Sequence, residues 1–271
     1  MPELPEVETT RRGIRPALVG RRIEKFDLRE PRLRWPVEPR LAAKIAGQRV
    51  VDVRRRAKYL LIDLERGTLI AHLGMSGSLR VLPATAPRLL HDHYDLVLDS
   101  GRCLRFNDPR RFGSLHWSPG DPEAHELLAG LGPEPLEPSF EADHLARLAR
   151  GRKVAVKLFL MDQRVVVGVG NIYASEALFR AGVRPRRAAG RLRRAEWAKV
   201  VDAVREVLAD AIRRGGTTLR DYVNADGTPG YFRQELHVYE RTGEPCRRCA
   251  TPIRHLVQGQ RSTYFCPACQ R

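Results

Sequence analysis

Four cysteines close to the C-terminus have the spacing of metal ligands, Cys246-x2-Cys249-x16-Cys266-x2-Cys269. Each close pair can offer two thiolates from one tight turn, which suits a tetrahedral zinc ion. The residues between the pairs predict a β-hairpin that brings both turns to one structural Zn²⁺. Two disulfides in a secreted tail are the alternative. The N-terminal residues lack an apolar export signal, so we favour zinc in a reducing compartment, the cytoplasm with its nucleoid.

A second candidate for chemistry lies at the other end of the chain, in Pro2 and Glu3. Removal of Met1 would expose the secondary amine of Pro2. An α-amine has a pKa near 8, so it is partly neutral at pH 7 and can attack an electrophilic carbon. Glu3 stands beside it as a candidate general acid or base. Proline and acids also suit the first turn of a helix, and the residues alone leave both interpretations open.

The charge balance favours a polyanionic partner. The 271 residues include 48 Lys and Arg against 32 Asp and Glu, for a formal net charge of +16. Residues 180–194 alone carry seven Arg and no acid. No apolar run approaches the roughly 20 residues that span a membrane. Nucleic acid is therefore the favoured partner class.

Hydrophobic periodicity divides the chain into a strand-rich part and a helical part. Residues 2–17 predict a helix, and residues 22–116 predict short strands separated by turn residues, as in a β-sandwich or barrel. Residues 118–139 contain no Lys or Arg and predict a short helix and then a linker. Residues 140–214 are mostly helical, most clearly over 196–212. The fold class is α+β and multidomain.

Eight segments, in order along the whole chain, resemble the bacterial formamidopyrimidine-DNA glycosylases. They are MPELPEVETTRRGI, RRAKYL, HLGMSGSLR, NDPRRFG, KLFLMDQRVVVGVGNIYASEALF, GGTTLRDYV, DGTPGYFRQELHVY and GQRSTYFCPACQ. The resemblance implies base-excision repair. The activity would be that of a bifunctional glycosylase and AP lyase that removes oxidised purines, 8-oxoguanine and formamidopyrimidines, from duplex DNA. Base removal would proceed through a Schiff base of the N-terminal proline, and β,δ-elimination would then cleave the strand. The protein would act as a monomer.

The resemblance also implies a domain layout. The layout comprises a catalytic β-sandwich domain at 1–131, a hinge linker at 132–139, a helix–two-turn–helix domain at 140–236 and a zinc finger at 237–271.

Site roles carry over from the resemblance position by position. The implied catalytic residues are Pro2 as nucleophile, Glu3 as proton donor to the deoxyribose, Lys58 for β-elimination and Arg261 for δ-elimination. The implied DNA contacts are His72, His91, Arg110, Arg152, Lys157 and Asn171. Arg152 stands where some relatives have lysine. The residues that would fill the duplex after base flipping are Met75, Arg110 and Phe112.

A lesion-capping loop is the last implied feature. It comprises Thr217, Thr218, Leu219, Arg220, Asp221 and Tyr222, after the Gly215-Gly216 pair. 8-Oxoguanine carries N7–H, so its reader needs an acceptor, which a backbone carbonyl in such a loop can supply. A plain surface connector is the other interpretation. Cys103 falls in a predicted strand and has no assigned role.

Two other functions compete with this one. An endonuclease VIII-type glycosylase would act on oxidised pyrimidines; Leu4 and residues 215–239 favour the purine enzyme. A non-catalytic zinc-ribbon DNA-binding protein would explain the charge and the cysteines, but it leaves the Pro2-Glu3 pair unused. Borohydride trapping of a covalent complex on lesion DNA separates an enzyme from a binding protein.

Overall fold

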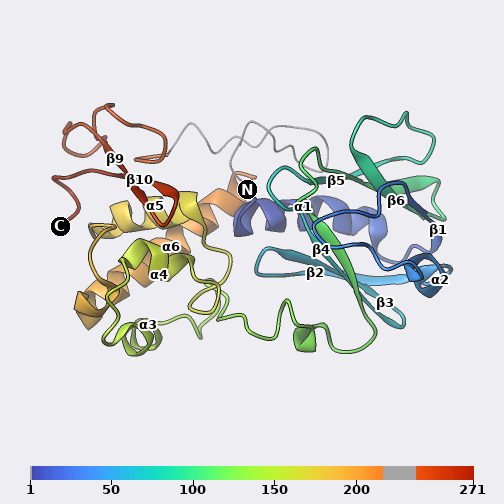
Figure 1. Cartoon of the computed structure of the whole chain (residues 1–271), viewed down its shortest axis with the longest axis horizontal. Coiled ribbons are helices and arrows are strands. Elements are labelled where there is room, and N and C mark those ends of the chain that lie inside the picture. The colour runs from blue at the N-terminus through green and yellow to red at the C-terminus, as the bar shows by residue number, and fades with distance from the viewer. Residues whose placement is uncertain (1, 216–235) are drawn as a thin grey trace. The chain divides into compact units, whose positions relative to one another are not determined.

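The computed structural model describes residues 2–215 and 236–271, which form two compact units. In the described residues, unit 1 comprises 2–129 and 214–215, and unit 2 comprises 130–213 and 236–271. The expected linker, 132–139, begins just after the division at residue 130. Figure 1 shows the strand-rich and the helical parts of the chain.

The described residues of unit 1 form two antiparallel four-stranded sheets. The first has the order β1 (Ile23–Leu28), β6 (Asp92–Leu98), β7 (Arg102–Asn107) and β5 (Ser78–Pro83). The second has the order β2 (Val50–Arg56), β3 (Tyr59–Leu64), β4 (Gly67–His72) and β8 (Ser114–Ser118).

One hydrophobic core lies between these sheets and takes residues from both. Leu60 and Ile62 of β3 belong to the same buried cluster as Leu96 of β6 and Leu104 of β7. The core residues alternate along these strands, as in Leu60, Ile62 and Leu64 of β3, so they lie on the face of the sheet that points into this core. The predicted sandwich is therefore confirmed.

The first helix, α1 (Leu4–Leu18), contacts β2 and β3 of the second sheet and β5 of the first. Its apolar residues Val7, Ile14 and Leu18 recur at helical spacing and join the sandwich core. The helix confirms the predicted one, and it fixes the position of the residues that precede it. A shorter helix, α2 (Leu41–Ile45), contacts β1.

The described residues of unit 2 contain four α-helices: α3 (Ala142–Ala149), α4 (Val156–Met161), α5 (Asn171–Ala181) and α6 (Arg194–Arg213). The predicted helix over 196–212 is confirmed as α6, which buries Trp197 and the valines of its apolar face. α5 ends at Gly182, whose φ of +71° is the left-handed conformation common after helices. Between the sandwich and α3, the expected short helix is a single 3-10 turn, Pro122–Ala124.

The C-terminal hairpin consists of β9 (Arg254–Gln258) and β10 (Arg261–Phe265), as the cysteine spacing predicts. β10 contacts α5, and a small apolar cluster forms there from Phe179, Val238, Cys246, Ile253 and Cys266. Among the described residues, no helix is long and apolar enough to cross a membrane.

Candidate active site and nucleic-acid interface

Glu3 is held in a fixed position by the start of α1. Its backbone is extended, with φ −102° and ψ −170°, and its carboxylate accepts the N–H of Glu6. In return, the Glu3 N–H donates to Glu6 Oε2 at 2.8 Å. Both residues are buried, at 2% and 0% exposure. This capping box holds an acid directly beside Pro2. The helix-start interpretation is confirmed, and the chemical one stays a prediction.

A lysine and a histidine lie near the ends of β3 and β4. Lys58 is 6% exposed and follows Ala57, whose φ is +54°. Tyr59 pairs with His72 across the two strands, and their rings are 4.9 Å apart. Burial, together with the nearby charges of Lys58 and Arg34, lowers the pKa of His72 to about 4. His72 is therefore a neutral imidazole at pH 7.

The tautomer of His72 follows from a hydrogen bond to the backbone. The Gly74 N–H donates to His72 Nδ1 at 3.0 Å. The ring proton must then be on Nε2, which makes this nitrogen a neutral hydrogen-bond donor. A neutral donor suits a phosphate oxygen without adding charge next to Lys58.

Two turns that carry the predicted intercalating residues lie side by side; we call residues 73–77 and 108–113 the plug turns. A Cβ at Gly74 would lie 2.4 Å from the backbone of Phe112 and of Gly113, so only glycine permits this approach. Gly74 has a φ of +69°. Met75 follows it and is partly buried. The structure thus brings the turn of Met75 against the turn of Arg110 and Phe112.

Asp108 organises the plug turns from inside. Its side chain is fully buried and accepts hydrogen bonds from Ser76 Oγ at 2.8 Å and from Gly113 N at 2.8 Å. It also accepts the Arg110 N–H at 3.2 Å. Sequence reasoning missed this role, although Asp before Pro at a turn is a signal for side-chain capping of backbone N–H groups.

Two side chains on the second plug turn stack on each other. Arg110 and Phe112 are exposed, Phe112 at 41%, and the guanidinium carbon of Arg110 lies 4.9 Å from the Phe112 ring centroid. This is a cation–π contact, which presents charge and apolar surface together. Next to them, His91 adopts φ +73°, and its carbonyl accepts the Asp108 N–H at 3.1 Å.

In unit 2, the predicted phosphate site is the N-terminus of α5. Gly170 is the N-cap and, as a glycine, has no side chain to cap this end; Asn171 is the first helical residue. A helix N-terminus presents backbone N–H groups and a positive dipole to an anion. The preceding loop is braced by Gln163, whose Oε1 accepts the Gly168 N–H at 2.9 Å.

Lys157 lies inside unit 2 rather than on its surface. Its side chain is 0% exposed, and Nζ donates to Asn171 Oδ1 at 2.6 Å. It also donates to Ser262 O and Thr263 Oγ1, both at 2.8 Å. These bonds tie α4 to the first residue of α5 and to β10. Lys157 therefore orients Asn171 and the hairpin, a position that differs from the expected direct contact with DNA.

A second buried polar group, Glu176, anchors the entry to the zinc module. It is 3% exposed, and its carboxylate accepts the N–H groups of His237, Val238 and Tyr239 at 2.8–2.9 Å. Burial raises the pKa of Glu176, and the three N–H groups oppose that rise. No sequence signal indicates this contact, because its partners lie about 60 residues away.

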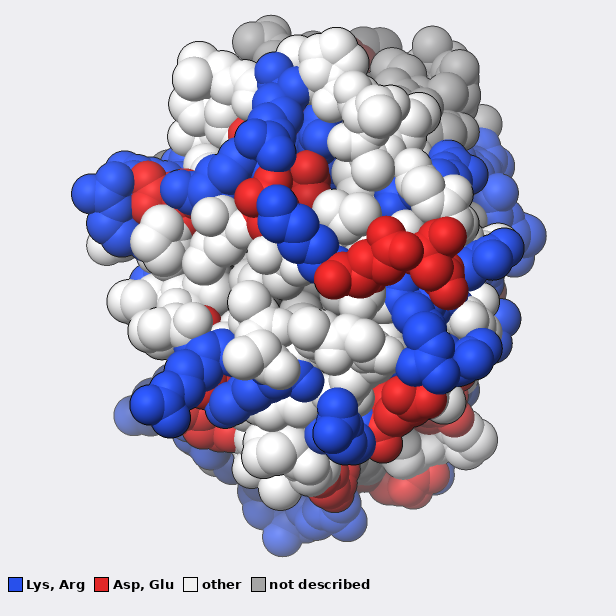
Figure 2. Space-filling model, turned by 90° about the vertical axis from the view of Figure 1, so that its right-hand side faces the viewer, with Lys and Arg blue, Asp and Glu red and all other residues white. Residues whose placement is uncertain are grey.

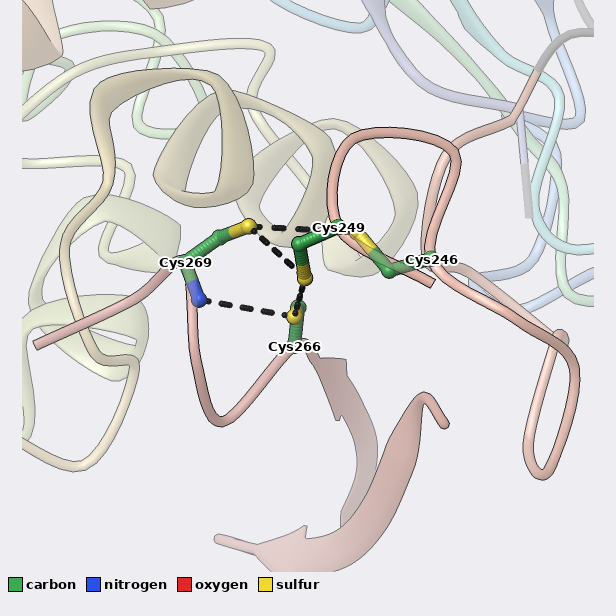
Figure 3. A group of neighbouring side chains, drawn as sticks. All are labelled: Cys246, Cys249, Cys266 and Cys269. Carbon is green, nitrogen blue, oxygen red and sulfur yellow. Dashed lines mark hydrogen bonds between the residues drawn. The ribbon is translucent and has the colours of Figure 1, made fainter. Parts of the chain in front are cut away.

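The four cysteine sulfurs converge on one point, as Figure 3 shows, with all four Sγ atoms within 4.8 Å of one another. The Sγ–Sγ distances include 3.9 Å for Cys246–Cys269, 3.5 Å for Cys249–Cys266 and 3.4 Å for Cys249–Cys269. A tetrahedral zinc ion with Zn–S bonds near 2.3 Å requires sulfurs about 3.8 Å apart. The cysteines are free thiols, far from disulfide distance, and form a site for one metal ion.

Arg261 and Arg152 are exposed, at the start of β10 and just after α3. Arg261 follows a tight turn in which Gly259 and Gln260 have φ of +51° and +60°. Cys103 is fully buried in unit 1. The expected lesion loop, 217–222, lies outside the described residues.

Comparison with known proteins agrees with this architecture. Residues 1–115 match the formamidopyrimidine-DNA glycosylase N-terminal domain, 131–223 its H2TH domain and 243–271 the zinc finger found in FPG and IleRS. The domains are thus those of a DNA repair glycosylase with a zinc finger.

Relatives along the full length give the family. The chain is 62% identical to formamidopyrimidine-DNA glycosylase of Thioalkalivibrio sulfidiphilus and 59% to that of Methylococcus capsulatus, with all of each chain covered. Among solved structures, MutM (Fpg) of Thermus thermophilus aligns with a TM-score of 0.89 at 43% identity, over 99% of this chain and 98% of that one. A Lactococcus lactis FPG mutant in complex with Fapy-dG DNA aligns with 0.93 at 33%, over 100% of both. The chain belongs to the formamidopyrimidine-DNA glycosylase family.

Proposed function

We propose that this protein removes oxidised purines, chiefly 8-oxoguanine and formamidopyrimidines, from duplex DNA and then cleaves the strand. The observation that carries the proposal is the buried Glu3 carboxylate, fixed beside Pro2 by its mutual hydrogen bonds with Glu6. A buried acid next to an amine nucleophile is suited to proton transfer during base release. The names of the relatives and the lesion DNA bound by a structural neighbour support the same substrate class.

In the proposed reaction, Pro2 becomes the N-terminal residue once Met1 is removed. Its amine attacks C1′ as the bond from C1′ to the base breaks, and the base leaves with the bonding electrons and takes up a proton. The Glu3 carboxylate takes the proton that the Pro2 nitrogen loses and passes it to O4′. The C1′–O4′ bond breaks, the deoxyribose ring opens, and the amine nitrogen and C1′ form an iminium ion. The iminium withdraws electrons from C2′ and so makes the C2′ proton acidic.

Strand cleavage follows from that acidity. Loss of the C2′ proton expels the 3′ phosphate in β-elimination, and a second proton loss expels the 5′ phosphate in δ-elimination. We assign Lys58 to the first step and Arg261 to the second. Water then hydrolyses the iminium ion and returns the free Pro2 amine.

DNA positioning completes the proposal. His72, Asn171, His91 and Arg152 would contact phosphates. Met75, Arg110 and Phe112, on the plug turns, would occupy the space left by the flipped base. We assign Lys157 the orientation of Asn171. The zinc ion, when bound, holds the hairpin that carries Arg261.

The test is borohydride trapping on three duplexes that contain 8-oxoguanine, an oxidised pyrimidine or no lesion. Borohydride delivers hydride to the iminium carbon and gives a stable amine, so a covalent protein–DNA complex reports the reaction. We expect trapping on the 8-oxoguanine duplex and little on the other two. Preferential trapping on the pyrimidine lesion would instead support the endonuclease VIII type, and no trapping on any duplex would overturn the proposed chemistry.

A further inference from the structure

Unit 2 has a concentration of positive charge that the proposed reaction does not use. Residues 150–153 contain three Lys and Arg, and residues 184–193 contain five Arg, without an acid in either segment. Arg187 is half-buried, and Arg184 is exposed and lies over the Phe265 ring. The other six are also exposed: Arg150, Arg152, Lys153, Arg186, Arg191 and Arg193. Of these six, Arg152 alone has an expected role.

These six cations form no ion pair with a carboxylate in the part of the chain that the structure describes. The acids nearby are already paired: Asp143 with Arg194, Glu196 with Arg187, and Asp162 with Arg164. Exposed arginines elsewhere in both units often have acidic partners, as in Arg15–Asp52 of unit 1 and Arg194–Asp143 of unit 2. Figure 2 shows this mixing of signs on the face nearest α2 and β1. Unpaired like charges repel one another, so their clustering favours a polyanionic ligand.

The backbone fixes the two segments against each other. Ala155 and Ala188 form an antiparallel bridge, and the Ala189 N–H donates to Val154 O at 2.8 Å. The Gly190 N–H donates to Arg152 O at 3.0 Å, and a Cβ at Gly190 would lie 2.9 Å from that oxygen. The cations thus project from a backbone arrangement that does not depend on their side chains.

The same segments adjoin the expected phosphate site of unit 2. The Val156 N–H, at the start of α4, donates to Arg187 O at 2.8 Å. Pro185 O accepts a hydrogen bond from Gln258 Nε2, at the end of β9, at 3.5 Å. Lys157 of α4 in turn contacts Asn171. The basic segments therefore pack on the elements that present Asn171 and the zinc hairpin.

We propose that Arg150, Lys153, Arg186, Arg191 and Arg193 continue from the expected phosphate contact Arg152 as a second phosphate-binding surface, the flank surface, for duplex DNA beyond the lesion. The inference rests on the proposed function, because it assumes that DNA occupies the Asn171 site. The flank surface extends the contact to phosphates farther along the duplex. It adds affinity and salt dependence without reading sequence.

The test compares the salt dependence of binding on a lesion duplex of about 12 base pairs and one of about 40 base pairs. The variant R186Q/R191Q/R193Q removes three charges from the flank surface and keeps the side-chain stems. The control R21Q/R40Q/R66Q removes three exposed charges from unit 1. The slope of log K against log salt is negative, and each lost phosphate contact makes it less steep by about 0.9. We therefore expect the magnitude of the slope to decrease by roughly 1 to 3 for the flank variant, on the long duplex only.

Single-turnover excision on the short duplex, at saturating enzyme, should be unchanged in the flank variant. The proposal would be overturned if the flank variant changed the slope equally on both duplexes or left it unchanged on the long duplex. It would also be overturned if the control variant changed the slope on the long duplex as much as the flank variant does. An equal loss of affinity for single-stranded DNA would overturn it as well. Failure of the wild-type protein to excise the lesion would refute the proposed function instead, and the slope comparison would still decide whether the flank surface binds DNA.

Discussion

The start of α1 and the zinc module are both expected to serve the reaction, but they are stabilised in different ways. Glu3 is held by a capping box on a helix that packs into the large core of a β-sandwich. The hairpin that carries Arg261 rests on a small cluster and on four cysteines around one metal site. The position of Glu3 therefore depends on many weak contacts, whereas the position of the hairpin depends chiefly on one bound ion. Damage to each should therefore remain local.

The largest effect should come from loss of the metal. Cys249→Ser should abolish zinc binding and remove hydrogen-exchange protection from β9 and β10, while β3 and β4 keep theirs. A structural zinc site contributes apparent binding free energy of about 10–16 kcal/mol, which the small cluster cannot replace. Elemental analysis and exchange measurements check this. Cys103→Ala, a cysteine outside the site, should retain zinc; a protected hairpin in zinc-free Cys249→Ser would contradict the comparison.

Loss of the buried amine that joins the hairpin to the helices should have the next largest effect. Lys157→Met leaves Asn171 Oδ1, Ser262 O and Thr263 Oγ1 without their donor. We expect a loss of roughly 3–5 kcal/mol in the stability of unit 2. Denaturant unfolding measures it, with the exposed Lys153→Met as control, expected within about 0.5 kcal/mol of wild type. Equal stability of the two variants would show that the buried contacts contribute little.

Acid should weaken unit 1 through His72. Its pKa is about 4 in the folded state against 6.5 in the unfolded chain, so the unfolded state binds more protons between these values. The associated stability is present above pH 6.5 and is lost as pH falls toward 4, by up to about 3 kcal/mol. His72→Gln lacks this titration. Unfolding at pH values of about 7.5 and 4.5 should therefore show a smaller acid loss in the variant, and identical losses would contradict the assignment.

A smaller effect should follow from Asp108→Asn, which places an amide donor against the Gly113 N–H. We expect a local cost of about 1–3 kcal/mol and displaced plug turns. Excision of 8-oxoguanine should slow, while cleavage at a pre-formed abasic site is largely kept, and Met75→Ala should act in the same sense. Single-turnover rates on both substrates decide this. The exposed Asp99→Asn is the control, and an equal loss on both substrates would mean that the turns only support the fold.

The sequence predicted the regular elements well and the long-range polar contacts poorly. Strands such as 59–64 and the helix 194–213 have clear periodicity, and the cysteine spacing defines the metal site. Neither periodicity nor spacing could predict the contacts of Lys157, because its partners Ser262 and Thr263 lie about 105 residues away in the sequence. A lysine in a basic chain suggests the surface, and only tertiary packing placed this one inside.

The central claim is that Pro2 supplies the nucleophile beside Glu3. The most direct measurement is mass spectrometry of peptides from the borohydride-trapped complex with 8-oxoguanine DNA. We predict that Met1 is absent and that the DNA remnant is attached to the α-nitrogen of Pro2. Glu3→Gln should form much less of this adduct on the lesion duplex. Attachment to a lysine such as Lys58, with Pro2 unmodified, would contradict the claim.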